Sequence, residues 1–174
     1  IIHNGINVKK LDHTYAYSRE VEAKSGLNSY RILFVGRLER RKGVETLLDS
    51  LPIILEHERD ASIIFAGEDT RITPGRISCQ SYLLSRAKKK GLEDKIFFTG
   101  RVSEAEKIAL YKACDVVCIP SIYEAFSYVC LEAMVFAKPI VAGKAGGLSE
   151  ILENGKSGML VPPNDPHELG VTLA

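Results

Sequence analysis

The sequence predicts an α/β protein with a doubly wound, Rossmann-like parallel sheet of about six strands. Two observations lead to this prediction. Short apolar runs rich in β-branched residues alternate along the chain with longer segments in which apolar residues recur at helical spacing. Short turns that carry glycine join the runs to the segments that follow them. Neither an internal repeat nor a low-complexity tract breaks this alternation.

The chain divides into a lead-in segment, residues 1–29, and one domain, residues 30–174. The lead-in opens with the turn signal His3-Asn4-Gly5-Ile6 and continues as a mixed polar stretch. We therefore expect it to be a linker with at most one short helix.

In the first half of the domain, the apolar run 30–35 predicts a strand that is followed at once by a glycine. Apolar residues at helical spacing then predict a helix over 43–57. A second apolar run predicts a strand over 62–66, and the polar stretch 68–76 predicts a loop. Residues 77–90 predict a helix that a following glycine closes.

The middle of the domain contains the run 116–119, which is short, β-branched and uncharged and therefore suits a strand buried on both faces. It follows a strand predicted over 96–99 and a helix predicted over 103–114, whose first residues form a capping-box pattern. A proline ends the central strand because it has no N–H to donate. The next helix begins after Ser127, which can cap its first turn, and stops at Lys138 before a proline.

The last part of the domain repeats the pattern in shorter pieces. Strands are predicted over 139–142 and 158–161, with a short helix over 150–153 between them. The proline-rich segment 162–166 then starts a final helix.

Composition limits the functions that the chain can have. With 174 residues, 45% apolar and 26% charged, it has the make-up of an ordinary globular domain. A net charge of +1 gives no support to a nucleic-acid partner or to an anionic membrane surface. No apolar run approaches the ~18 residues that a membrane span needs. The chain lacks an initial Met and stops at Ala174 inside a predicted helix, so we expect a fragment of a longer protein.

The cysteines indicate a compartment. None of the four belongs to a C-x-x-C pair, and three of them lie in apolar stretches. Reduced, buried thiols of this kind are typical of a cytoplasmic protein. The four cysteines are Cys79, Cys114, Cys118 and Cys130.

The turn after the central strand has the features of an anion site. The unpaired amides of Ala125 to Tyr128 point out of a helix start, where the helix dipole favours an anion. Glu124 lies in this turn, and Glu132 lies eight residues further on. In one regular helix that separation is ~12 Å, which is too far for two carboxylates that share a proton. A ligand with a phosphate for the amides and separate hydroxyl groups for each carboxylate fits this arrangement.

A basic segment follows the first strand. Arg37 comes directly after the glycine that ends the strand, and Lys42 precedes a glycine at the start of the next helix. A guanidinium and an ammonium at this position are suited to hold a diphosphate leaving group. Arg40 and Arg41, between them, are interpreted as solvated loop residues. The segment is neither a Walker A loop nor a G-x-G-x-x-G fingerprint.

Other candidate features are weaker. Backbone groups of Arg101 and Val102 could meet a flat base, or these residues could form a plain turn. Gly146-Gly147 could be a second backbone cradle. The four histidines are scattered without ligand spacing, so no metal site is predicted. Tyr123 and Phe126 are interpreted as walls of the pocket or as core.

Taken together, these motifs resemble the C-terminal, donor-binding domain of the retaining glycosyltransferases with the GT-B fold. The similar family is the large group 1 family, which includes glycogen, sucrose and lipopolysaccharide sugar transferases. The likeness runs over nearly the whole chain. Its motifs, from the most specific down, are the two glutamates at this spacing, then Gly36-Arg37-Leu38 with Lys42-Gly43, then Gly146-Gly147 with Glu150.

The resemblance implies a role for each candidate residue. Glu132 would bind the ribose hydroxyls of a nucleotide, and Glu124 would contact the transferred sugar and act in catalysis. Arg37 and Lys42 would hold the diphosphate and act in catalysis. Helix-start amides of Phe126, Ser127, Tyr128 and Val129 would assist the two cations at the diphosphate. Backbone groups near Arg101 and Val102 would meet the base, and Gly36 would also belong to the donor-binding site.

The resemblance also implies an activity. The expected reaction is transfer of a hexose from a UDP- or GDP-sugar to a saccharide or lipid-linked acceptor, with retention and without a metal or a cofactor other than the donor substrate. The acceptor-binding domain would precede this chain, and any membrane association would come through that half. A fragment without it is expected to bind a nucleotide sugar but to transfer little. Two rivals stay open: an epimerase acting on UDP-N-acetylglucosamine, and a non-catalytic nucleotide-sugar-binding module.

The chain departs from the family pattern in two ways. Ala125 and Ser127 stand where the family usually has glycines, which narrows the space beside the sugar. The stretch 68–76 replaces a short Gly-rich turn with a longer, charged loop.

Overall fold

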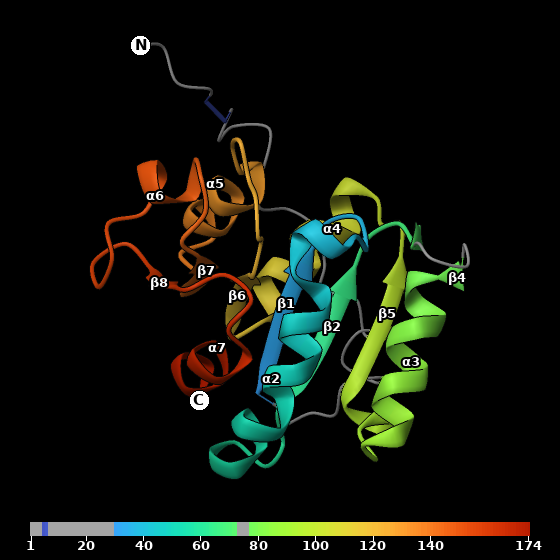
Figure 1. Cartoon of the computed structure of the whole chain (residues 1–174). Coiled ribbons are helices and arrows are strands. Elements are labelled where there is room, and N and C mark those ends of the chain that lie inside the picture. The colour runs from blue at the N-terminus through green and yellow to red at the C-terminus, as the bar shows by residue number, and fades with distance from the viewer. Residues whose placement is uncertain (1–4, 7–29, 73–76) are drawn as a thin grey trace.

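The computed structural model describes residues 5–6, 30–72 and 77–174 (Figure 1). The short helix allowed for in the lead-in segment and residues 73–76 of the predicted loop fall outside these described residues. The division into a lead-in segment and one domain therefore stays a prediction for residues 1–29.

The core of the domain is a parallel six-stranded sheet with the order β5-β2-β1-β6-β7-β8. This order confirms the predicted doubly wound fold. The chain runs outward from β1 to β5 and then returns to the other side of β1, so the order reverses between β1 and β6. The strands are β1 (Arg31–Val35), β2 (Ser62–Ala66), β5 (Ile96–Gly100), β6 (Val116–Ile119), β7 (Ile140–Gly143) and β8 (Met159–Val161).

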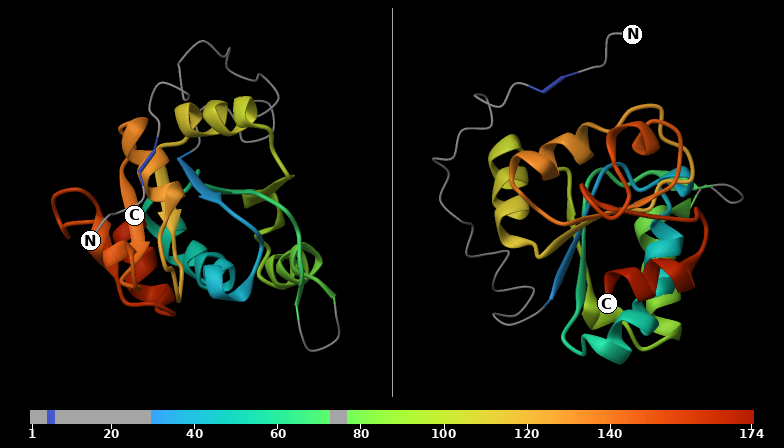
Figure 2. Two further views of the ribbon diagram at one scale, coloured as in Figure 1. Left: turned by 90° about the horizontal axis from the view of Figure 1, so that it is seen from above. Right: turned by 90° about the vertical axis from the view of Figure 1, so that its left-hand side faces the viewer.

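Helices cover both faces of the sheet. The first group, α2, α3 and α7, packs on one apolar cluster, and α4, α5 and α6 pack on the other. The two views in Figure 2 show these groups on opposite sides of the strands. The helices are α2 (Val44–His57), α3 (Cys79–Lys89), α4 (Glu104–Ala113), α5 (Tyr128–Val135), α6 (Leu148–Ile151) and α7 (Pro166–Leu173), with short 3-10 turns at η2 (Arg40–Lys42) and η3 (Glu93–Lys95).

Burial on both faces explains why the strands read as continuous apolar runs. In β1, Ile32 and Phe34 point into the cluster under α2, whereas Leu33 points into the cluster under α4 and α5. Successive side chains of a strand alternate between faces, so each face needs its own apolar residues. All residues of β2 and β6 are buried for the same reason.

The first difference from the sequence prediction lies between β2 and α3. An antiparallel pair of short strands replaces parts of both predictions: β3 (Arg71–Ile72) lies within the segment predicted as a loop, and β4 (Ile77–Ser78) takes the first two residues of the predicted helix. Helix α3 therefore begins at Cys79 and not at Ile77. Ser78 sets this start, because its side chain accepts a hydrogen bond from the amide of Ser81 and caps the first turn.

The second difference concerns α6, which was predicted over 150–153 and lies at Leu148–Ile151. The helix starts directly after Gly147, where the turn from β7 already has a helical backbone. Leu152 is extended, so the helix ends before Glu153.

Helix α4 is held at both ends, which matters because it faces the candidate site. At its start, Ser103 and Glu106 form the predicted capping box. At its end, Lys138 Nζ donates to the carbonyl oxygens of Lys112 and Cys114, at 3.0 and 2.8 Å. A cation at this position also interacts favourably with the helix dipole.

We expect Lys138→Met to reduce the free energy of unfolding by about 1–2 kcal/mol, because two carbonyl groups lose a charged donor. Urea denaturation followed by circular dichroism measures this loss. The matched control is Lys156→Met, whose exposed ammonium pairs with Glu153 and should contribute less than about 0.5 kcal/mol. Equal losses for the two variants would contradict the assignment.

All four cysteines are buried and unbonded to one another, in agreement with the prediction of buried thiols. Burial raises the pKa of Cys79 and Cys130 to about 11 and that of Cys114 to about 12. None of the helices in the described part of the chain has the length and apolarity that crossing a bilayer requires.

Candidate functional site

The candidate site lies at the carboxyl ends of β1 and β6, where the strand order reverses. Open α/β sheets bind ligands in the crevice outside this point. The turn after β1 carries Arg37 and Lys42, and the turn after β6 carries Glu124. The two turns touch, since the amide of Ile122 donates to the carbonyl of Arg41 at 2.9 Å.

Lys42 and Glu124 form a direct ion pair, with 2.5 Å between Nζ and Oε2. The side chains are 20% and 9% exposed. Ser121, which is fully buried, donates its hydroxyl to the same Oε2 at 3.2 Å. Among the described residues, Oε1 of Glu124 has no hydrogen-bond partner. Lys42 and Ser121 therefore fix the carboxylate through Oε2, and Oε1 can accept a hydrogen bond from a hydroxyl group of a ligand.

Arg37 lies on the open side of this turn. Its Nε contacts Oε1 of Glu39 at 2.8 Å, and its side chain is 58% exposed. Glu39 also binds Nε of Arg41 through its second oxygen. The terminal nitrogens of Arg37 make no hydrogen bond within the described part of the chain, so they can meet a phosphate. Arg37 and Lys42 make no contact with each other here.

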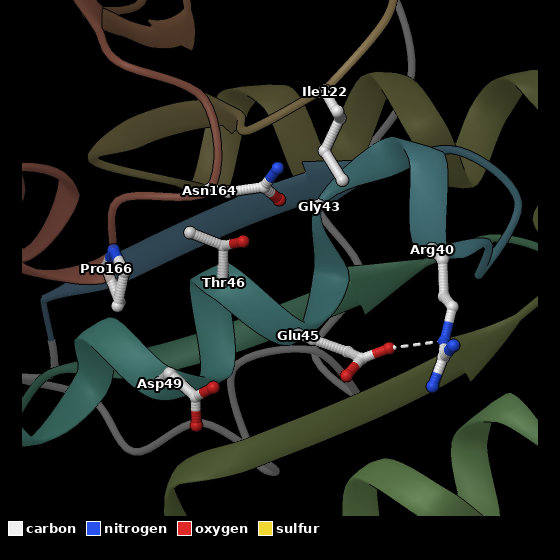
Figure 3. A pocket seen from close by; sticks show the side chains of 8 residues that line it. All are labelled: Arg40, Gly43, Glu45, Thr46, Asp49, Ile122, Asn164 and Pro166. Carbon is white, nitrogen blue, oxygen red and sulfur yellow. Dashed lines mark ion pairs between the residues drawn. The ribbon is translucent and has the colours of Figure 1, made fainter.

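Arg40 points to the other side of the turn, as the interpretation of a solvated residue expects. It pairs with Glu45 at 2.9 Å and lines a separate cavity of about 500 Å³ beside α2 (Figure 3). Thr46 and Asn164 are among the other residues that line this cavity. It contains none of the predicted donor-binding side chains.

Gly43 allows the two turns to approach closely. Its φ is +71°, in the left-handed region, and a Cβ atom at this position would lie 1.9 Å from the carbonyl oxygen of Pro120. A side chain would therefore separate Lys42 from the turn that carries Glu124. The glycine that follows Lys42 is thus required by packing of main chain on main chain.

Gly146 and Gly147 support the Glu124 turn from its other side. Added Cβ atoms would lie 2.3 Å from the carbonyl oxygens of Glu124 and Ala125, respectively. The amide of Gly147 already donates to the carbonyl of Glu124 at 2.8 Å. The suggested role of this pair as a second cradle is therefore wrong for the amide of Gly147, which holds the turn and is not free for a ligand.

The start of α5 has the capped, open geometry on which the predicted anion site depends. Ser127 is the N-cap, and its Oγ accepts from the amide of Cys130 at 3.2 Å. Within the described residues, the amides of 125–129 have no acceptor, so they can donate to a bound anion. Ser127 and Ala125 are the two positions at which the sequence departs from the expected glycines. The Ser127 side chain is buried and forms the cap, whereas Ala125 is exposed.

Glu132 lies in the second turn of α5 and faces α4. Lys107 Nζ contacts its Oε1 at 2.7 Å, and the Tyr111 hydroxyl donates to its Oε2 at 2.8 Å. Burial lowers the pKa of Lys107, but the bonds to Glu132 and Glu104 outweigh this and raise it overall. Burial, followed by the charge of Glu132, raises the pKa of Tyr111, so its hydroxyl stays a neutral donor.

The remaining predicted residues occupy the rim. Arg101 is exposed, and Val102 packs against the apolar cluster under α4. Phe126 is half-buried and meets Tyr128 edge-on, with 5.4 Å between ring centroids. Tyr123 is 64% exposed, so it belongs to the surface around the site and not to the core.

Three supporting residues were missed by reasoning from sequence: Ser121, Lys107 and Tyr111. Ser121 is three residues from its partner Glu124, and the Pro-Ser pair at the strand end was the signal that could have indicated it. Lys107 and Tyr111 lie 25 and 21 residues from Glu132. Their spacing of four residues places them on one face of a helix, but nothing in the sequence indicates which carboxylate they meet.

The structure holds together Lys42, Glu124 and the start of α5, with Arg37 at the open edge. Glu132 is held separately, by α4. In the described part of the chain, histidine, cysteine, aspartate and glutamate form no group that could hold a metal ion.

Comparison with known proteins relates this geometry to a family. The model of the family described as glycosyl transferases group 1 matches residues 18–173. The chain is 34% identical over 173 residues to an uncharacterised glycosyltransferase of Methanocaldococcus jannaschii, covering 97% of this chain and 42% of that protein. It is 31% identical over 165 residues to the glycogen synthase of Mycobacterium tuberculosis, covering 95% and 36%.

Solved structures show the same fold. HepE of Anabaena in complex with UDP matches with a TM-score of 0.83 and 28% identity, over 99% of this chain and 46% of that one. The C-terminal domain of a glycosyl transferase group 1 family protein from Francisella tularensis matches with a TM-score of 0.80 and 26% identity, over 97% and 86%.

The chain spans less than half the length of the curated relatives described above. Its sheet and flanking helices are one Rossmann-like half of a GT-B fold, as predicted. The match over residues 18–173 and the shared fold lead to one assignment: the chain, whose fold is that of the C-terminal domain of the Francisella tularensis protein, belongs to the glycosyl transferases group 1 family.

Proposed function

We propose that this domain binds the donor of a retaining glycosyltransferase, which transfers a hexose from a UDP- or GDP-sugar to a saccharide or lipid-linked acceptor. One observation carries the proposal. Lys42 and Glu124 are paired beside the unpaired amides at the start of α5, at the switch point of the sheet. An ammonium, a row of amide donors and a carboxylate with one open oxygen suit a ligand that carries both phosphate and hydroxyl groups.

Each residue has a role in this proposal. Arg37 and Lys42 neutralise the diphosphate, and Glu124 accepts a hydroxyl group of the hexose through Oε1. Glu132 binds the ribose. As the diphosphate leaves, charge grows on its oxygens, and oriented cations and amides stabilise that charge in the transition state. An acceptor hydroxyl that attacks the anomeric carbon on the face from which the diphosphate leaves, and gives its proton to a diphosphate oxygen, would retain the configuration.

Similar proteins support a nucleotide sugar as the ligand. HepE of Anabaena was solved with UDP, with UDP and glucose, and with UDP-glucose. A similar protein from Agrobacterium fabrum, 29% identical, is a mannosylfructose-phosphate synthase. The proposal includes a cytoplasmic location, which the four free, buried thiols support.

Calorimetric titration of the chain with UDP, GDP and ADP, and then with the corresponding sugars, tests the proposal. We expect UDP or GDP to bind with a dissociation constant of about 1 μM to 1 mM, the range of enzyme KM values. Glu124→Gln should weaken binding of the nucleotide sugar while leaving the nucleotide itself nearly unaffected. A folded chain that binds none of the three nucleotides would refute the proposed function.

We also propose that catalysis needs the acceptor half of the enzyme, because enzymes of this fold react their substrates between two domains. The chain alone is therefore expected to bind the donor and to transfer its sugar at less than about a thousandth of the rate of the intact enzyme. Release of nucleoside diphosphate, with and without a saccharide acceptor, measures this. Comparable turnover by the chain alone would show that the acceptor half is not required.

A further inference from the structure

Both oxygens of the Glu132 carboxylate are held by side chains of α4. Lys107 contacts Oε1 at 2.7 Å and Tyr111 donates to Oε2 at 2.8 Å. Glu132 is 9% exposed, and Tyr111 is fully buried. A buried carboxylate held at two points has a fixed position before any ligand arrives.

This arrangement leaves room for a ligand. An ionised carboxylate can accept about four hydrogen bonds, two on each oxygen. Lys107 and Tyr111 occupy one on each side. One acceptor position therefore remains on each oxygen, which suits two adjacent hydroxyl groups such as those of a ribose ring.

The two supporting residues are themselves well anchored. Lys107 and Tyr111 lie four residues apart, so they present their polar atoms on the same face of α4. The Tyr111 ring stacks on Phe136, with 5.3 Å between centroids and 14° between planes. Lys107 also contacts Glu104 at 3.1 Å, which holds its ammonium from the solvent side. Because the Tyr111 ring packs independently of its hydroxyl, the hydroxyl can be removed with little loss of packing.

We propose that Tyr111 and Lys107 are positioning residues, which orient the Glu132 carboxylate toward the adjacent 2′- and 3′-hydroxyls of the donor ribose. The inference rests on the proposed function, because it requires a ribonucleotide at this site. Neither residue touches the nucleotide; each acts through Glu132. The role is separate from that of Lys42 and Glu124, which hold the diphosphate and the sugar.

The experiment compares UDP with 2′,3′-dideoxy-UDP in binding titrations of the wild-type chain and its variants. The wild-type chain should bind UDP at least about tenfold more tightly than the dideoxy form, because the latter leaves Glu132 without its partners. In Tyr111→Phe this preference should fall to about threefold or less, mainly through weaker binding of UDP. Binding of the dideoxy form should change by less than about twofold, which a purely structural defect would not produce.

Matched controls separate the hydroxyl and the ammonium from general effects. Tyr82→Phe also removes a hydroxyl that donates to a carboxylate, that of Glu45, but on α3. Lys90→Met removes an ammonium paired with Asp49, as Lys107→Met removes the one paired with Glu132. Both control variants should keep the wild-type preference, and Lys107→Met should lose it.

The outcomes are distinguishable. A preference for UDP that survives in both Tyr111→Phe and Lys107→Met would overturn the positioning role. Equal binding of the two nucleotides by the wild-type chain would overturn it too, while leaving nucleotide binding intact. If the wild-type chain bound neither nucleotide, the proposed function and this inference would both fall. Thermal unfolding of each variant identifies those that are folded.

Discussion

Replacing both Arg37 and Lys42 with alanine should reduce kcat/KM for sugar transfer by the intact enzyme by about 10³-fold or more. Removal of one oriented donor at a developing negative charge typically costs about 10²–10³-fold in rate. Both cations are proposed to face the leaving diphosphate, one at the open rim and one beside Glu124. Initial rates with the natural donor measure the effect. Transfer that survives within a few-fold would show that the assigned role is wrong.

The same turn supplies a matched control. Arg40→Ala with Arg41→Ala removes two positive charges from neighbouring positions, but these side chains pair with Glu45 and Glu39. Their loss should change the rate by less than about threefold, since exposed pairs contribute little. If the two double variants were equally impaired, net charge and not the position of the cations would explain the result.

Lys42→Ala should also lower stability, because it leaves the buried Glu124 carboxylate without its cation. Removing one partner of a fully buried pair costs about 3–5 kcal/mol. The Lys42 side chain is 20% exposed, so we expect less, about 1–3 kcal/mol. Urea denaturation of each single variant separates this loss from the loss of catalysis.

Gly43→Ala should reduce the free energy of unfolding by about 2–5 kcal/mol and abolish most of the transfer activity. A left-handed backbone costs a non-glycine residue about 1–2 kcal/mol. The larger part comes from the Cβ atom, which would lie 1.9 Å from the Pro120 carbonyl oxygen. The turn after β6 must then move away from Lys42. Overpacking of this kind costs a further amount of about 1–3 kcal/mol.

Gly91→Ala isolates the backbone cost. Gly91 has a similar φ of +65°, but a Cβ atom there would meet nothing within 4 Å. Its loss of stability should therefore be about 1–2 kcal/mol, and its activity should be unchanged. Urea denaturation curves for the two variants provide the comparison. A Gly43 variant no less stable than the Gly91 variant would show that the turn tolerates the side chain.

Much of this architecture could be predicted from local patterns. The strands of the sheet are apolar on both faces, so runs such as 116–119 were visible in the sequence. Ser127 was predicted to cap the helix that follows it, and it does so through the amide of Cys130. Glu124 and Lys42 were both assigned to the site, because residues that follow parallel strands meet at one edge of the sheet.

The remainder depends on contacts that local patterns do not encode. The hairpin of β3 and β4 has strands of two residues, too short to show alternation. The pairing of Arg37 with Glu39 and the bonds from α4 to Glu132 arise only when turns and helices pack. For the same reason, the sequence indicated that Gly146-Gly147 had a role near the site, but not that its role was to hold the Glu124 turn.

The glycine contacts at Gly43, Gly146 and Gly147 have a consequence for divergence within the family. Where main chain touches main chain, an added side chain cannot change the shape of the candidate site gradually. It displaces a whole loop. Altered sugar preference is therefore expected to arise at outward-facing positions around the glycine contacts, such as the exposed Tyr123 and Ala125. Descendants that accept new donors should keep the glycines and vary this surrounding ring.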